Sequence, residues 1–137
     1  MAKPPCCRTF KTESQQLLMP VTKRTEDVKI ITVQPDETVS LSIIIGNAQI
    51  GSSAVKFKFS STVLAKGEIT NLELGKGVDL QGKILRVATR VLDANTATNK
   101  VVITHHFDNT SPEDSVYEDE ISDAQDVFTL LVDYKFA

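Results

Sequence analysis

The chain has 137 residues, of which 41% are hydrophobic and 24% are charged, and its formal net charge is −3 at pH 7. This length suits one domain with a sizeable core, and the composition is that of a soluble globular protein. No apolar run approaches the roughly 18 residues of a membrane-spanning helix, so we expect no membrane span.

Residues 1–25 are expected to form a flexible or loosely attached segment, ahead of a single domain over residues 26–137. The first ten residues are rich in proline and basic side chains and lack the apolar stretch of a secretory signal peptide, so we expect a cytoplasmic protein. The only cysteines, Cys6 and Cys7, are neighbours. A disulfide between them would be strained, and two thiols do not complete a zinc site, so we expect free thiols.

Apolar and polar residues alternate along most of the remaining chain, which is the pattern of half-buried β-strands. Residues 23–27 are expected to be a polar linker and residues 75–82 a turn-rich connection. The longer strands are predicted at residues 28–34, 38–45, 54–59, 83–92, 100–107 and 127–136. Shorter strands are predicted at residues 62–65, 68–74 and 116–117. The segments 83–92 and 100–107 are expected to pair as a hairpin with a long loop.

About seven to nine regularly spaced strands, with no helix of three turns, predict an all-β fold. We expect an antiparallel two-sheet β-sandwich of immunoglobulin-like or jelly-roll type, with a closed barrel as the main alternative. The chain has no tryptophan, so the core cysteine pair and tryptophan that mark true immunoglobulin domains are missing. Sandwich folds carry unrelated activities, and the fold alone predicts no function.

The charge is divided unevenly along the chain. Residues 1–100 hold 14 basic and 9 acidic side chains, a balance of +5, whereas residues 101–137 hold 1 and 9, a balance of −8. Such a division favours electrostatic contact within the fold or between copies. No compact basic patch with interleaved aromatic residues is present, so nucleic acid is not an expected partner.

These charges suggest two interaction surfaces. Four basic residues should line exposed strand faces and could dock onto the acidic segment 108–126 of a neighbouring copy: Lys56, Lys58, Arg86 and Arg90. The acidic candidates are Glu113, Asp114, Glu118, Asp119 and Glu120. We therefore expect a non-enzymatic interaction or structural module, either a homo-oligomer or a subunit of a larger protein assembly.

The alternative is a calcium-dependent sandwich module that binds lipid or carbohydrate. Calcium takes six to eight oxygen ligands, often from loops at one end of a sandwich. The candidate ligands are Asp108, Asp119 and Asp123, although the spacing of the acidic residues is not that of an EF-hand loop.

No catalytic grouping or cofactor motif stands out. His105 and His106 are adjacent on a predicted strand, so their rings should point to opposite faces and cannot bind one metal together. His105 shares its parity with apolar neighbours and is expected to face the core. The glycine-rich segment 75–82 precedes a strand rather than a helix, which argues against a phosphate-binding loop. We expect no cofactor.

Overall fold

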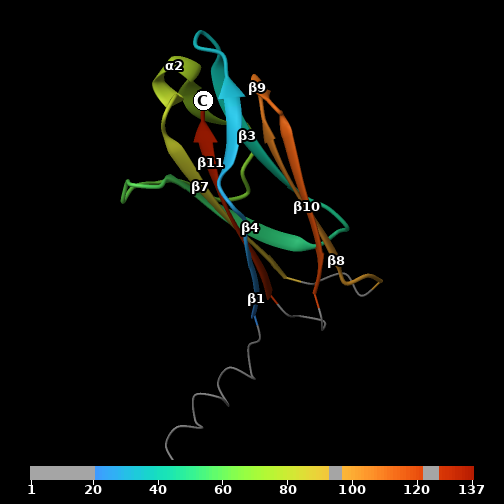
Figure 1. Ribbon diagram of the computed structural model, residues 1–137. Helices are drawn as coiled ribbons and strands as arrows, with labels where there is room; N and C mark the ends of the chain where they lie inside the picture. The colour runs from blue at the N-terminus through green and yellow to red at the C-terminus, as the bar shows by residue number, and fades with distance from the viewer. Residues whose placement is uncertain (1–20, 93–96, 122–126) are drawn as a thin grey trace, which may run out of the picture.

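The computed structural model describes residues 21–92, 97–121 and 127–137. These residues form an all-β fold of two packed sheets, with one short helical turn (Figure 1). Among them, no helix has the length and apolar character needed to cross a membrane.

The larger sheet has seven strands, in the order β5-β4-β7-β11-β2-β9, with β1 also paired to β11. Their bounds are β1 Val21–Thr25, β2 Lys29–Val33, β4 Ile50–Phe57, β5 Val63–Gly67, β7 Ile84–Leu92, β9 Thr110–Ser111 and β11 Val127–Phe136. β11 pairs antiparallel with β7 but parallel with β1 and β2. The sheet is therefore mixed, and the expected strictly antiparallel sandwich is not confirmed.

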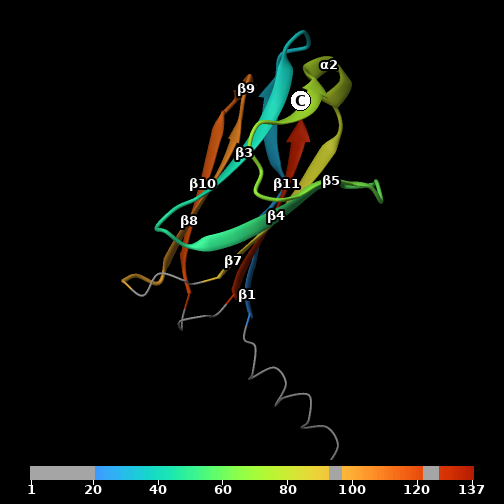
Figure 2. The same ribbon diagram turned by 180° about the vertical axis from the view of Figure 1, so that it is seen from behind.

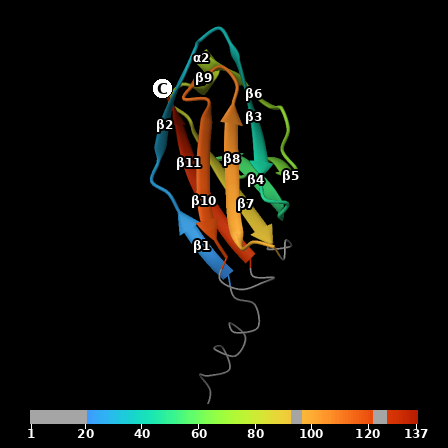
Figure 3. The same ribbon diagram turned by 90° about the vertical axis from the view of Figure 1, so that its right-hand side faces the viewer.

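The smaller sheet has four strands, in the order β10-β8-β3-β6, and all of its pairings are antiparallel (Figure 3). Their bounds are β3 Thr38–Ile45, β6 Leu72–Lys76, β8 Lys100–Phe107 and β10 Asp114–Glu120. The single helical turn, α2, covers Gly77–Leu80 and is followed by strand β7. This order agrees with the prediction that a strand follows the glycine-rich segment, but the segment itself is not all turn, because Gly75 and Lys76 end strand β6 and Gly77–Leu80 form the helical turn.

Three predicted strands, at residues 38–45, 100–107 and 127–136, have the predicted bounds. The predicted hairpin between β7 and β8 is wrong. β7 pairs with β4 and β11, and β8 pairs with β3 and β10, so the connection between them crosses from one sheet to the other. Val21–Thr25, which overlaps the expected polar linker, is strand β1.

The strand predicted at residues 54–59 is displaced. β4 begins at Ile50 and ends at Phe57, so the segment with Gly51 belongs to the strand. Phe59 shares the inward parity of Phe57 but lies in the turn that follows, where it is 88% exposed. The alternation of apolar and polar residues predicted which face of the sheet each side chain of the strand lies on, but it did not predict where the strand ends.

The core lies between the sheets and is filled by alternate residues of the long strands. β11 is the main contributor, because all five of its inward side chains are buried: Phe128, Leu130, Val132, Tyr134 and Phe136. Residues of β3 and β8 meet them from the smaller sheet, including Leu41 and Phe107. The Phe107 ring packs edge-on against Tyr134, with ring centroids 4.8 Å apart.

Gly51 is required where β4 passes close to its neighbours. A Cβ on this residue would lie 2.6 Å from the Arg90 carbonyl oxygen of β7 and would also clash with the Cδ1 atom of Ile45 on β3. The absence of a side chain therefore lets β3 and β4 begin their divergence into different sheets.

Gly51→Ala should destabilise the fold, because the backbone of β7 cannot move away from the added methyl group without disturbing the sheet. We expect the free energy of unfolding to fall by about 1–3 kcal/mol, measured by denaturant unfolding. The matched control is Ser52→Ala at the next, exposed position. Equal stability of the two variants would contradict the close approach.

Candidate interaction surfaces

The outer face of the larger sheet is basic. Inward residues of its strands are buried, so alternate residues point away from the smaller sheet. Among the strand residues of this face, counted together with Lys58, which directly follows β4, seven lysine or arginine side chains accompany one carboxylate, Asp133, a balance of +6. We refer to these seven as the basic face: Lys23, Lys56, Lys58, Lys66, Arg86, Arg90 and Lys135. All four predicted basic residues belong to it.

Asp133 organises the centre of the basic face. Arg86 donates two hydrogen bonds to it, from Nε to Oδ1 at 2.9 Å and from Nη2 to Oδ2 at 3.1 Å, and the Lys58 Nζ lies 3.6 Å from Oδ2. The hydrogen bonds from Arg86 hold the pKa of Asp133 below its ordinary value. A carboxylate on the outward side of a strand was visible in the sequence, but its partners depend on strand order.

An acidic strip runs along β10, one of the two edge strands of the smaller sheet. Ser115 and Tyr117 are buried, so the alternate residues of β10 point outward. We define the acidic strip as four exposed residues at the start of β10 and along it: Glu113, Asp114, Glu118 and Glu120. Two basic side chains of β8 neighbour the strip, because Lys100 is paired in register with Glu120 and His106 with Asp114. The alternate residues of β10 point outward from the smaller sheet and the basic face points outward from the larger sheet, so the two charged surfaces face away from each other.

Asp119, the fifth predicted acidic residue, is engaged within the fold. The Arg24 Nη1 lies 3.4 Å from Asp119 Oδ2 and donates to the Glu118 carbonyl oxygen at 3.0 Å. Arg24 Nε donates to Glu26 at 2.6 Å, and this bond is the largest cause of the raised pKa of Arg24. The guanidinium also lies 5.8 Å from the centre of the Tyr117 ring. Arg24 thus links β1 of the larger sheet to β10 of the smaller one.

His106 lies on the outer face of the smaller sheet between two carboxylates. Its Nδ1 is hydrogen-bonded to Asp114 Oδ1, and its Nε2 lies 2.8 Å from Asp108 Oδ1. The bond to Asp114, followed by the bond to Asp108, raises the pKa of His106 above its ordinary value. Over the described parts of the chain, no group of three or more ligating side chains is arranged to hold a metal ion.

The three candidate calcium ligands are not brought together. Asp108 directly follows β8, whereas Asp119 is paired with Val101 near the other end of that strand. Seven residues of extended strand span about 23 Å, so Asp108 and Asp119 cannot share one ion. Asp123 lies outside the described residues, as do Cys6 and Cys7.

His105 is completely buried, as its parity predicted, and belongs to a polar chain across the core. Its Nδ1 is joined to the Tyr134 hydroxyl by a hydrogen bond of 2.6 Å, and that hydroxyl lies 3.1 Å from the hydroxyl of Tyr117. On the other side, Nε2 lies 3.5 Å from Thr89 Oγ1, which is 2.9 Å from Ser53 Oγ. The chain joins strands of both sheets and gives their buried polar groups partners.

Burial determines the charge of these groups. Desolvation, with a smaller contribution from the charge of Lys29, lowers the pKa of His105 to about 3. Desolvation likewise raises the pKa of both Tyr117 and Tyr134. The imidazole and both phenols are therefore neutral at neutral pH, which is the form that a dry core tolerates.

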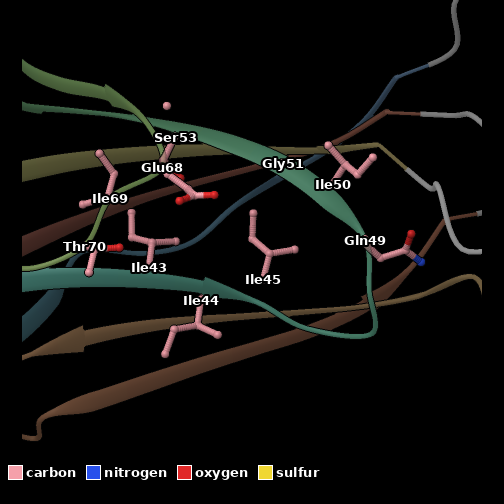
Figure 4. A pocket seen from close by; sticks show the side chains of 11 residues that line it. Ile43, Ile44, Ile45, Gln49, Ile50, Gly51, Ser53, Glu68, Ile69 and Thr70 are labelled. Carbon is pink, nitrogen blue, oxygen red and sulfur yellow. The ribbon is translucent and has the colours of Figure 1, made fainter.

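A groove opens between β3 and β4, where these consecutive strands diverge into different sheets (Figure 4). Its volume is about 400 Å³. Ile43 and Ile45 from β3 and Ile69 from the β5–β6 connection give it apolar walls, and Glu68 and Ser53 also line it. Alternation predicted that Ile43 and Ile45 face inward, but the groove follows from the path of β4, which is not a local property of the sequence.

The chain was compared with protein-family models, curated proteins and solved structures, and no match was found in any of the three.

The contributions of His105 and His106 to the free energy of unfolding should change with pH in opposite directions. The pKa of His105 is about 3 in the folded chain and near 6.5 when unfolded, so between these values the unfolded chain binds the extra proton. Its contribution to the free energy of unfolding should fall as the pH drops below 6.5, by up to about 1.4 kcal/mol per pH unit. The raised pKa of His106 adds stability below pH 6.5, which is lost as the pH rises through its folded value.

Denaturant unfolding of His106→Asn between pH 7 and pH 5 isolates the contribution of His105. In the wild-type chain, an NMR titration should show the His105 ring neutral down to pH 5 and the His106 ring more than half protonated at pH 6.5. A His105 ring that titrates near pH 6.5 would contradict its burial.

Proposed function

We propose that the protein is a non-enzymatic module that assembles with copies of itself, the basic face of one copy binding the acidic strip of another. The observation that carries this proposal is the placement of opposite charges on the outer faces of different sheets. Because the two surfaces cannot meet within one chain, their attraction acts between chains.

The arrangement of the charges supports such an interface. The basic face has a balance of +6 even after Asp133 is counted, and the acidic strip is exposed along an edge strand. Complementary surfaces of this kind accelerate association and fix its orientation more than they strengthen it. The contact also covers the free edge of β10, which is the part of a sheet most open to unwanted pairing.

The interface joins unlike surfaces, so it is heterologous. Each copy that uses its basic face still has a free acidic strip, and each copy that uses its strip still has a free basic face. Such contacts close into a ring or extend into a filament, depending on the rotation between neighbours.

The buried polar chain supports a structural role over a catalytic one. His105 and Tyr134 have the most strongly shifted pKa values in the described residues, and they bond to each other inside the core. A general acid or base needs a proton within reach of substrate and a pKa near the working pH. Their burial instead suits a connection that sets how the two sheets pack.

Association through charged surfaces should depend strongly on salt. At about 20 mM salt the mass measured by light scattering should rise with protein concentration, and at 0.5 M salt this charge contact should be lost, because the screening length falls well below 10 Å. A chain that is monomeric at both salt concentrations and at every protein concentration would overturn the proposal.

Charge reversal locates the two surfaces. Arg90→Glu on the basic face or Glu118→Lys on the acidic strip should weaken association about fivefold at low salt, which corresponds to about 1 kcal/mol for an exposed charge. Lys76→Glu and Glu37→Lys are the matched controls, because both residues are exposed and lie outside the two surfaces. Controls that weaken association equally would show an effect of net charge alone.

A further inference from the structure

We propose a second, apolar contact between copies, in which Phe59 of one copy inserts into the groove between β3 and β4 of another. It rests on the self-association proposed above and adds a contact that charge does not supply. Its two parts are an exposed aromatic ring on a projecting turn and an isoleucine-lined groove.

Phe59 is presented by the turn between β4 and β5, which projects sideways from the larger sheet (Figures 1 and 2). The Ser60 amide donates to the Phe57 carbonyl oxygen at 3.0 Å, and the Thr62 amide donates to the Ser60 hydroxyl at 3.1 Å, so the turn has a defined shape. The ring of Phe59 is 88% exposed. An aromatic ring held in water on an ordered turn has much apolar surface to bury against a partner.

The groove can receive such a ring. Its volume of about 400 Å³ lies within the range of ordinary ligand pockets, about 300–1,000 Å³. Ile43, Ile45 and Ile69 supply apolar walls, as Figure 4 shows for the side chains between the two strands. At its rim, Ile44 and Ile50 are 57% and 62% exposed and could pack around the inserted turn.

Charge at the two sites is complementary. Glu68 lines the groove beside its isoleucines. Lys58 precedes Phe59, and its Nζ lies 5.7 Å from the centre of that ring. Insertion of Phe59 would carry the Lys58 ammonium towards Glu68. Lys58 is only loosely held by Asp133, at 3.6 Å, and can turn to a new partner.

A chain cannot fill its own groove in this way. Ile50 lies at the groove and Phe59 lies beyond the other end of the same strand, β4. The seven residues of extended strand from Ile50 to Phe57 span about 23 Å, and Ser53, the groove residue of β4 nearest to Phe59, is still about 13 Å from Phe57 along the strand. The occupant must therefore be a second copy, and the contact is heterologous, like the proposed charge contact.

Two complementary variants test this contact. Phe59→Ser removes the ring and keeps the groove, and Ile50→Lys blocks the exposed rim of the groove and keeps the ring. The masses are measured by sedimentation velocity at 0.5 M salt, where the charge contact is screened and apolar burial is not. Wild-type chains should form dimers or larger species, each variant alone should be a monomer, and an equal mixture should form dimers only.

Val78→Ser is the control, because Val78 is 56% exposed on α2 and belongs neither to the lining of the groove nor to the turn between β4 and β5. Thr70→Trp fills the groove from another side and should also prevent association. It shows whether the effect of Ile50→Lys comes from blocking the groove or from the change at Ile50 itself. If either Phe59→Ser or Ile50→Lys alone associates as the wild type does, or their mixture stays monomeric, the apolar contact is overturned.

The salt dependence of assembly distinguishes the apolar contact from the charge contact of the proposed function. Wild-type assembly at low salt that is lost at 0.5 M salt would overturn the apolar contact and leave the charge contact standing. Assembly that persists at high salt, requires Phe59 and is indifferent to Arg90→Glu would support the apolar contact and overturn the charge contact.

Discussion

The structure depends on one constraint: alternate residues of β11 must be buried between two sheets. β11 lies between β7 on one side and β1 and β2 on the other, and its five inward side chains fill the middle of the core. The same alternation forces Asp133 outward, where it bonds Arg86 across the strand pair. One face of β11 therefore belongs to the core and the other belongs to the basic face. A shift of its register by one residue would exchange the two faces, so it would disrupt the core and the basic face together.

The polar chain through His105 makes that packing specific. Apolar side chains alone allow two sheets to slide, whereas the bond between His105 and Tyr134 fixes β8 against β11 at one position. The cost is a histidine that must stay neutral, which makes the core sensitive to acid. Arg24 makes a second link between the sheets at the rim, where water screens it.

Local pattern in the sequence predicted the strands but not their partners. Residues 38–45, 100–107 and 127–136 were predicted with the right bounds because a period of two is a property of neighbouring residues. The hairpin between β7 and β8 was wrong because a seven-residue connection is long enough to cross between sheets. Of the candidate surfaces, the outward facing of Arg86 followed from parity. Its bond to Asp133 did not, since it depends on which strands are adjacent.

The groove is a consequence of the two-layer fold. β3 and β4 are consecutive but belong to different sheets, so they must separate, and Gly51 allows β4 to pass close to Ile45 as they do. A gap therefore remains at the side of the molecule with isoleucines on its walls, while the turn at the far end of β4 exposes Phe59. β4 thus contributes one wall of a groove that carries isoleucines and, beyond its far end, leads into the turn that exposes Phe59.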